Sequence, residues 1–182
     1  MKLTPQTAVL RDGRACLLRS PDAEDWETMI DLLRVTAAET PYLIRYPEEI
    51  DMVPEQEQAY LRAQAESPRS IMICAFDGAR ALGSCGINPV GERIKLRHRC
   101  SIGIALRREC WGAGLGGQLF RIGLEQARAL GFEQIELGVF EPNERAIALY
   151  KKCGFEVWGA TPRAARLKGG SYLTELTMGK LL

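Results

Sequence analysis

Four glycines fall within six residues near the middle of this chain, in the stretch Cys110-Trp111-Gly112-Ala113-Gly114-Leu115-Gly116-Gly117. An apolar run at 101–106 precedes them, and a run with apolar residues at helical spacing, 119–130, follows. This order predicts a strand, a glycine turn and a helix. Glycines lack the Cβ atoms that hold a ligand away from the backbone, and the first N–H groups of a helix have no intrahelical partner. The stretch therefore predicts a phosphate or pyrophosphate site rather than a plain turn.

The composition narrows the class of protein. A chain of 182 residues with 46% hydrophobic and 26% charged residues is typical of a soluble globular protein, and we expect a single domain over 1–182. A net charge of +1 gives no reason to expect nucleic acid or a membrane as partner. We expect neither a membrane span nor a signal peptide, because no apolar run is long enough and the first residues are polar. Six scattered cysteines and one histidine predict reduced thiols, a cytoplasmic location and no metal site.

Strands and helices alternate along the chain, which predicts a mixed α/β fold in one piece. Apolar and alternating runs predict seven strands, at 15–19, 71–76, 81–87, 98–106, 134–140, 153–158 and 172–178. Helical spacing and capping residues predict four helices: one from the Ser20-Pro21 pair to Ala38, one over 54–67, one from the glycines to Gly131, and one over 144–152.

A second motif follows the glycine stretch, after the strand at 134–140. On a helix, Asn143, Ala146 and Tyr150 lie at i, i+3 and i+7 and so share one face. Taken alone, Asn143 predicts a helix N-cap, and Tyr150 predicts a packed aromatic ring with its hydroxyl at the edge of the core. The motif is informative only together with the glycine stretch.

The two motifs in this order resemble the Gcn5-related N-acetyltransferase (GNAT) superfamily. Trp111 to Gly117 resembles its acyl-CoA pyrophosphate loop, Gln/Arg-x-x-Gly-x-Gly/Ala, with Trp111 at the first position, and the run from Asn143 to Phe155 resembles its second conserved block. The resemblance implies a central mixed, mostly antiparallel seven-stranded sheet, with splayed fourth and fifth strands, flanked by about four helices. It also implies acetyl-CoA as the cosubstrate.

The resemblance further implies a role for particular residues. The acetyl group would pass directly from acetyl-CoA to the primary amine of a small molecule or peptide, in a ternary complex. Tyr150 would be the general acid toward the CoA thiolate, and Asn143 would steady the cofactor or its local water while capping its own helix. The cofactor contacts would come from Ile104, Ala105, Leu106, Trp111, Gly112, Ala113, Gly114, Leu115, Gly116, Gly117, Asn143, Ala146 and Tyr150.

No general base is assigned from the sequence. Many relatives carry a glutamate at the position aligned with Ser101, and a serine is not an efficient base. Glu136 is a candidate, although a glutamate in a strand is more often half of a surface ion pair. His98, the single histidine, is interpreted as an ordinary strand residue.

The acceptor pocket is expected in the break between the first two helices, at Tyr42, Arg45 and Tyr46, with 163–170 as its opposite wall. This expectation rests on location alone, and the acceptor amine stays open. Many relatives dimerise, so a homodimer is possible, but no feature of the chain fixes the oligomeric state.

Three alternatives compete with this interpretation. Cys110, just before the helix, is a possible nucleophile, although packing is the better interpretation. The spacing Gly112-x-Gly114-x-x-Gly117 formally matches a dinucleotide-binding motif, but too little chain follows for the second half of such a fold. The third alternative is a catalytically weak acyl-CoA sensor with the same fold.

Overall fold

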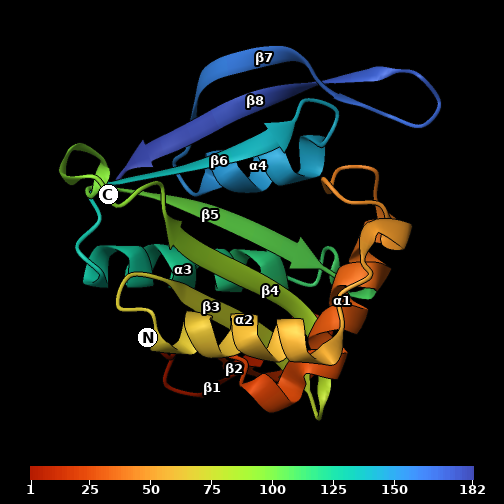
Figure 1. Cartoon of the computed structure of the whole chain (residues 1–182), viewed down its shortest axis with the longest axis vertical. Coiled ribbons are helices and arrows are strands. Elements are labelled where there is room, and N and C mark those ends of the chain that lie inside the picture. Colours follow the sequence, from red (N-terminus) through yellow and green to blue (C-terminus); the bar gives the residue numbers. More distant parts are fainter.

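Eight strands form one sheet in the order β1-β2-β3-β4-β5-β6-β8-β7 (Figure 1). The computed structural model describes all 182 residues. All neighbouring strands are antiparallel except β5 and β6. The strands are β1 (Gln6–Val9), β2 (Ala15–Arg19), β3 (Ile71–Asp77), β4 (Arg80–Pro89), β5 (Arg99–Leu106), β6 (Gln134–Phe140), β7 (Glu156–Arg166) and β8 (Tyr172–Leu181).

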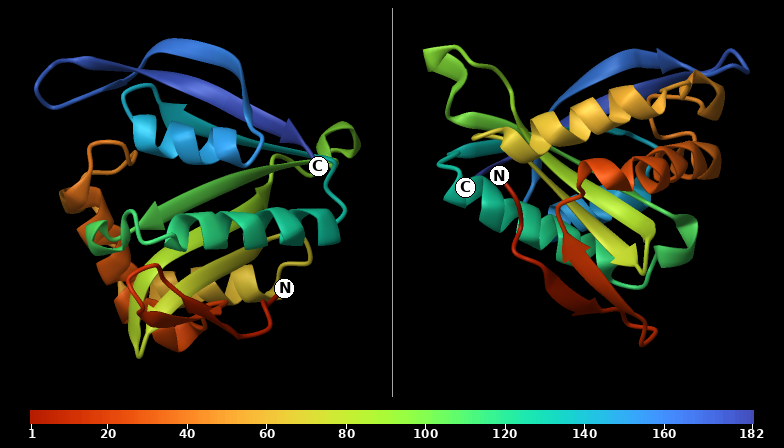
Figure 2. Two further views of the ribbon diagram at one scale, coloured as in Figure 1. Left: turned by 180° about the vertical axis from the view of Figure 1, so that it is seen from behind. Right: turned by 60° about the horizontal axis from the view of Figure 1, so that its bottom comes forward.

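Helices cover both faces of this sheet. On one face lie α1 (Trp26–Glu39) and α2 (Pro54–Glu66), and on the other lie α3 (Leu115–Ala129) and α4 (Glu144–Lys152) (Figure 2). Four short 3₁₀ turns, η1 (Ala23–Asp25), η2 (Pro47–Glu49), η3 (Ile94–Leu96) and η4 (Arg108–Cys110), complete the elements. None of these helices combines the length and the apolar character that crossing a bilayer requires.

The main core lies between the sheet and the α3–α4 face. It contains 28 buried residues, among them Leu119 and Phe120 of α3, both fully buried. Gly123 brings α3 close to the sheet, because a Cβ there would lie 3.1 Å from both Cys85 Sγ and Ile102 Cδ1. This close packing holds the start of α3 at the end of β5.

The parallel strands β5 and β6 separate after three residues. Their pairing covers only Arg99–Ser101 against Gln134–Glu136, whereas β5 stays paired with β4 as far as Leu106. The backbone N–H and C=O groups of successive residues in a strand point alternately to its two sides. Just beyond β5, Arg107 N–H donates to Leu82 O on β4, so the backbone groups of Arg107 point toward β4. By the same alternation, Ala105 directs its backbone groups toward β4, and Ile104 and Leu106 direct theirs into the gap that opens between β5 and β6.

Most predicted elements are confirmed, and three differ. The prediction of seven strands is wrong by one, because it leaves out β1 at Gln6–Val9, in which only Ala8 is buried. The splayed pair is consequently the fifth and sixth strand. The first helix begins at Trp26, after η1, because the Ser20 hydroxyl accepts from Leu3 N–H and donates to Met72 O instead of capping a helix. The sixth predicted strand, β7, starts later and runs on to Arg166.

Candidate active site

The glycine stretch forms the turn between η4 and α3. Gly112 and Gly114 have φ of 77° and 88°, a region that favours glycine, and Gly114 is the N-cap of α3. Gln118 N–H makes the first bond of this helix, to Gly114 O at 3.2 Å. The N–H groups of residues 114–117 donate to no backbone acceptor, so this helix end presents a row of free donors.

A hairpin from the start of the chain holds this turn in place. At its tip, between β1 and β2, Arg11 N–H donates to Ala113 O at 2.9 Å. The Arg11 side chain lies over Gly114, with Cγ and Nε each 3.4 Å from where a Cβ would stand. Arg14 Nη2 donates to Glu109 O at 2.9 Å. The sequence analysis missed this support, because no local pattern connects the first residues to the glycine stretch.

A cavity of about 520 Å³ lies along the turn, the end of β5 and α4. Its wall contains three cationic side chains, Arg11, Arg145 and Lys152, and no carboxylate. All the predicted cofactor residues line it except Ala113 and Leu115, which are buried. An elongated ligand with several negative charges therefore suits this cavity.

Trp111 closes one end of the turn. Its Nε1 donates to Leu106 O at 3.0 Å, which occupies the carbonyl that the splay would otherwise leave free. The Arg145 guanidinium lies 3.4 Å from the centre of the Trp111 ring, and Arg108 lies 5.2 Å from it. Of the Leu106 backbone groups, only the N–H is therefore left to face the gap.

Tyr150 lies on α4 at the floor of the same cavity. Its ring centre is 5.0 Å from that of Phe120, and the residue is 7% exposed. Burial raises the pKa of the Tyr150 hydroxyl to about 12, with a smaller contribution from Cys85. The phenol is therefore fully protonated at neutral pH.

Asn143 caps α4, as its position predicted. Its Oδ1 accepts from Ala146 N–H at 3.4 Å, and its own N–H donates to Phe140 O at 2.8 Å. Asn143, Ala146 and Tyr150 all line the cavity of about 520 Å³, so one face of α4 presents the three predicted residues together.

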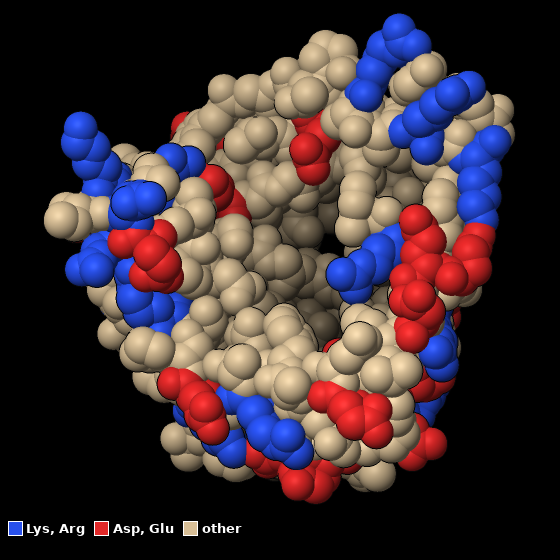
Figure 3. All heavy atoms as spheres, in the orientation of Figure 1, with Lys and Arg blue, Asp and Glu red and all other residues tan.

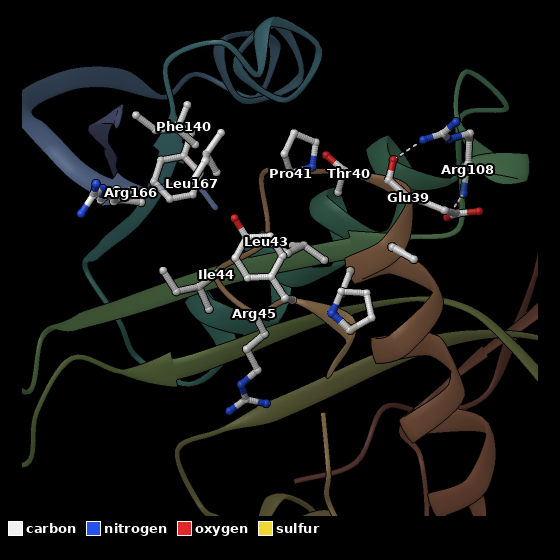
Figure 4. A pocket seen from close by; sticks show the side chains of 16 residues that line it. Glu39, Thr40, Pro41, Leu43, Ile44, Arg45, Arg108, Phe140, Arg166 and Leu167 are labelled. Atoms are coloured by element: carbon white, nitrogen blue, oxygen red, sulfur yellow. Dashed lines mark hydrogen bonds between the residues drawn. The ribbon is translucent and has the colours of Figure 1, made fainter. Parts of the chain in front are cut away.

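A second cavity, of about 570 Å³, adjoins the first on the α1–α2 side, and Thr40 and Leu43 line both. In Figure 3 this side of the molecule is hollowed at its centre. The connection from α1 to η2 faces Phe140, Arg166 and Leu167 across the second cavity (Figure 4). Of the residues expected at the acceptor pocket, Arg45 and Tyr46 line this cavity, Tyr42 lines the first, and the wall at 163–170 contributes Ala165 to Leu167.

One end of the second cavity is fixed by an interaction between the α1 end and η4. Arg108 N–H donates to Glu39 Oε2 at 2.6 Å, and the Arg108 side chain donates to Glu39 O (Figure 4). These two hydrogen bonds connect the end of α1, which lines the second cavity, to η4, which leads into the glycine turn.

The residues considered as base or nucleophile are accounted for as follows. Glu136 forms a bidentate ion pair with Arg99, with N···O distances of 2.7 to 3.2 Å, so its role is structural. Ser101 Oγ donates to Asn88 O at 3.3 Å. Cys110 is 1% exposed and burial raises its thiol pKa, so packing is its role rather than nucleophilic attack. The mostly antiparallel sheet excludes the parallel fold that the dinucleotide alternative requires.

Known proteins with similar sequences and structures belong to one family. The model of the acetyltransferase (GNAT) family matches residues 27–155. The L-methionine sulfoximine/L-methionine sulfone acetyltransferase of Pseudomonas paraeruginosa is 27% identical over 124 residues, which cover 68% of this chain and 71% of that protein. The L-amino acid N-acetyltransferase AaaT of Escherichia coli is 32% identical over 93 residues, or 50% of this chain and 57% of that protein. The crystal structure of a GNAT-family acetyltransferase from Streptococcus pneumoniae superposes with a TM-score of 0.87 at 28% identity, covering 92% of this chain and 99% of that one.

Proposed function

This chain belongs to the acetyltransferase (GNAT) family, and we propose that it acetylates the primary amine of a small, amino-acid-like acceptor directly from acetyl-CoA in a ternary complex. The observation that carries the proposal is the first cavity, which runs from the free N–H groups of the glycine turn to the gap between β5 and β6. Its cations and its lack of carboxylates suit the pyrophosphate and 3′-phosphate of the cosubstrate.

The gap between β5 and β6 is where we place the thioester. The pantetheine arm would replace β6 as the hydrogen-bonding neighbour of Ile104 and Leu106, whose backbone groups face the gap. The N–H of either residue would then donate to the thioester oxygen as negative charge develops on it. Removing a donor of this kind typically costs about 3 kcal/mol of transition-state stabilisation.

Tyr150 is the proposed general acid. The amine nitrogen attacks the carbonyl carbon, the C–S bond breaks, and the phenol gives its proton to the departing sulfur. The Tyr150 phenol is buried against Phe120, and because burial raises its pKa it is protonated, and able to donate, at neutral pH. Asn143 keeps its structural role as the cap that orients this face of α4.

The second cavity suits an amino-acid-like acceptor. Its apolar wall, with Leu43, Ile44 and Phe140, fits an aliphatic side chain, and Arg45 and Arg166 supply cations for a carboxylate. The two relatives, an L-methionine sulfoximine/L-methionine sulfone acetyltransferase and an L-amino acid N-acetyltransferase, support the same acceptor class.

The experiment that tests the cofactor site is calorimetric titration of acetyl-CoA into the wild type and Gly114→Asp. A side chain at φ of 88° against Arg11, with a negative charge at the free N–H groups, should abolish binding by a folded variant. Gly131→Asp is the matched control, because Gly131 also has positive φ (78°) but lies at the far end of α3. Normal binding by folded Gly114→Asp would refute the site.

A further inference from the structure

We propose that Glu175, on β8, is the general base that removes a proton from the acceptor ammonium, a role for which Ser101 is unsuited. This inference rests on the proposed acetyl transfer, and it assigns the one chemical group that the site still lacks. Three observations carry it: the face of the sheet on which Glu175 lies, its contact with β6 beside the gap, and its freedom from any partner.

The strand register places Glu175 on the acceptor side of the sheet. Glu175 is opposite Phe140 in the β6–β8 pairing, and Phe140 lines the second cavity. The adjacent residue Leu176 is opposite Val139 and packs with the core on the other face. Because side chains alternate between faces, Glu175 shares the face of Phe140 and of the acceptor cavity.

The Glu175 side chain reaches across β6 toward the gap. A Cβ at Gly138 would overlap the Glu175 carboxylate and lie 2.9 Å from its Cδ. Gly138 is two residues beyond Glu136, the last β6 residue that pairs with β5. The carboxylate therefore covers the part of β6 where the two strands have already separated, which is where the thioester is proposed to lie.

The face of the sheet above β4 and β5, next to the gap, is open. Gly103, on β5 across the gap, would have no heavy atom within 4 Å of a Cβ, and Gly86 on β4 would have only Asn88 Nδ2, at 3.6 Å. Gly86 and Gly103 are directly paired and lie on the same face as Ser101, so they leave space above two adjacent strands. An acceptor amine has room there beside the carboxylate.

Glu175 has no partner that would occupy its oxygens. The residue is half-buried, and its carboxylate takes part in no hydrogen bond and in none of the nine ion pairs. Glu136, on the same face, is fully engaged with Arg99. Glu57, another carboxylate without an ion pair, lies buried on α2 on the same side of the sheet.

The charged and titratable groups on the elements next to Glu175 are as follows. On β6 and β5 they are Glu136 and Arg99, which form an ion pair. On β7 they are Arg163 and Arg166, and on β8 itself the group is Tyr172. On the connection from α1 to η2 they are Arg45 and Tyr46. Arg163 and Arg166 stack on the Tyr172 ring, at 3.9 and 5.7 Å from its centre.

The proposed step balances as follows. Glu175, directly or through one water, takes a proton from the ammonium, and the freed lone pair forms the C–N bond. The C–S bond then breaks, Tyr150 protonates the sulfur, and the second nitrogen proton leaves and restores Tyr150. The net products are the N-acetyl compound, CoA thiol and one proton, which Glu175 releases to solvent.

The test is the pH profile of kcat/KM for Glu175→Gln, with an L-amino acid that the wild type acetylates. We expect a loss of about 100-fold at pH 7, the usual size of a general-base contribution, with unchanged acetyl-CoA affinity. The loss should shrink about tenfold per pH unit as free amine replaces ammonium. Glu136→Gln and Glu57→Gln are the matched controls, and we expect both to keep the wild-type profile.

Gly138→Ala tests the same group without removing its charge, because the new methyl group would displace the carboxylate. We expect it to reproduce the Glu175→Gln profile, and it also decides the question if Glu175→Gln does not fold. A wild-type profile in either folded variant, or the pH-dependent loss in Glu57→Gln instead, overturns the inference. An inactive wild type would instead contradict the proposed function, so the two failures are distinguishable.

Discussion

Tyr150 illustrates how one side chain serves both packing and chemistry. Its ring packs between Phe120 and Phe155, with ring centres 5.0 and 6.3 Å away, and it also lines the first cavity. Burial both holds the ring in one orientation and raises the pKa of the hydroxyl to about 12. A substitution that keeps the ring and removes the hydroxyl therefore keeps the aromatic packing and removes only the proton donor.

Tyr150→Phe should lower kcat by about 100-fold and change the acetyl-CoA affinity by less than about threefold, because the ring contacts remain and only the proton donor is lost. Steady-state kinetics with a calorimetric titration measures both. Tyr60→Phe is the control, since Tyr60 lies on α2 and lines neither cavity. Equal losses in kcat and in affinity would remove Tyr150 from the acid role.

At the scale of elements, the β1–β2 hairpin supports the glycine turn between η4 and α3. Backbone and side-chain bonds join the two, and Gln118 Nε2 adds a third bond to Val9 O at 3.0 Å. Of the hairpin side chains, Arg11 alone lines the first cavity. We expect it to bind a phosphate of the cosubstrate.

Arg11→Ala should weaken acetyl-CoA binding about fivefold to tenfold, which corresponds to about 1 to 1.4 kcal/mol for an exposed charged contact. Titration with acetyl-CoA and with the dephospho form, which lacks the 3′-phosphate, shows which phosphate is involved. Arg121→Ala is the control, because Arg121 is an exposed cation of α3 that pairs with Glu125 and lines neither cavity. Equal affinities for Arg11→Ala and the wild type would contradict the assignment.

Elements defined by local patterns were predictable from the sequence, whereas contacts between distant strands were not. The bounds of β6 and α4 match their predictions because a period of two and a capped helical period are visible within ten residues. The contacts of Arg11 with Gly114 and of Glu175 with Gly138 depend on strand order and register. Register is a property of the assembled sheet, so no single segment of sequence carries it.

At the scale of the whole molecule, buried thiols should make stability depend on pH. Burial raises the pKa of Cys85 and of Cys100 to about 12. The folded state therefore holds these protons more tightly than the unfolded chain. Their contribution is complete below the ordinary thiol pKa of about 8.5 and is lost as the pH rises toward 12.

We therefore expect the free energy of unfolding, under reducing conditions, to fall between pH 8.5 and 10.5, with each thiol contributing at most about 1.4 kcal/mol per pH unit. Urea denaturation at several pH values measures this. Cys85→Ala should show a smaller slope than the wild type, because one of the buried thiols is absent. A free energy independent of pH over this range would contradict the burial of these groups in a protonated form.

The central claim concerns the whole catalytic assembly, two adjoining cavities that bring acetyl-CoA and a small amine to the gap between β5 and β6. The most direct measurement is release of CoA thiol from acetyl-CoA with a panel of L-amino acids, methionine sulfone and polyamines, with mass detection of the product. The account predicts one acetyl group on the α-amine per thiol released, with preference for apolar amino acids. Tight acetyl-CoA binding with no acetylated amine would contradict it and favour the acyl-CoA sensor.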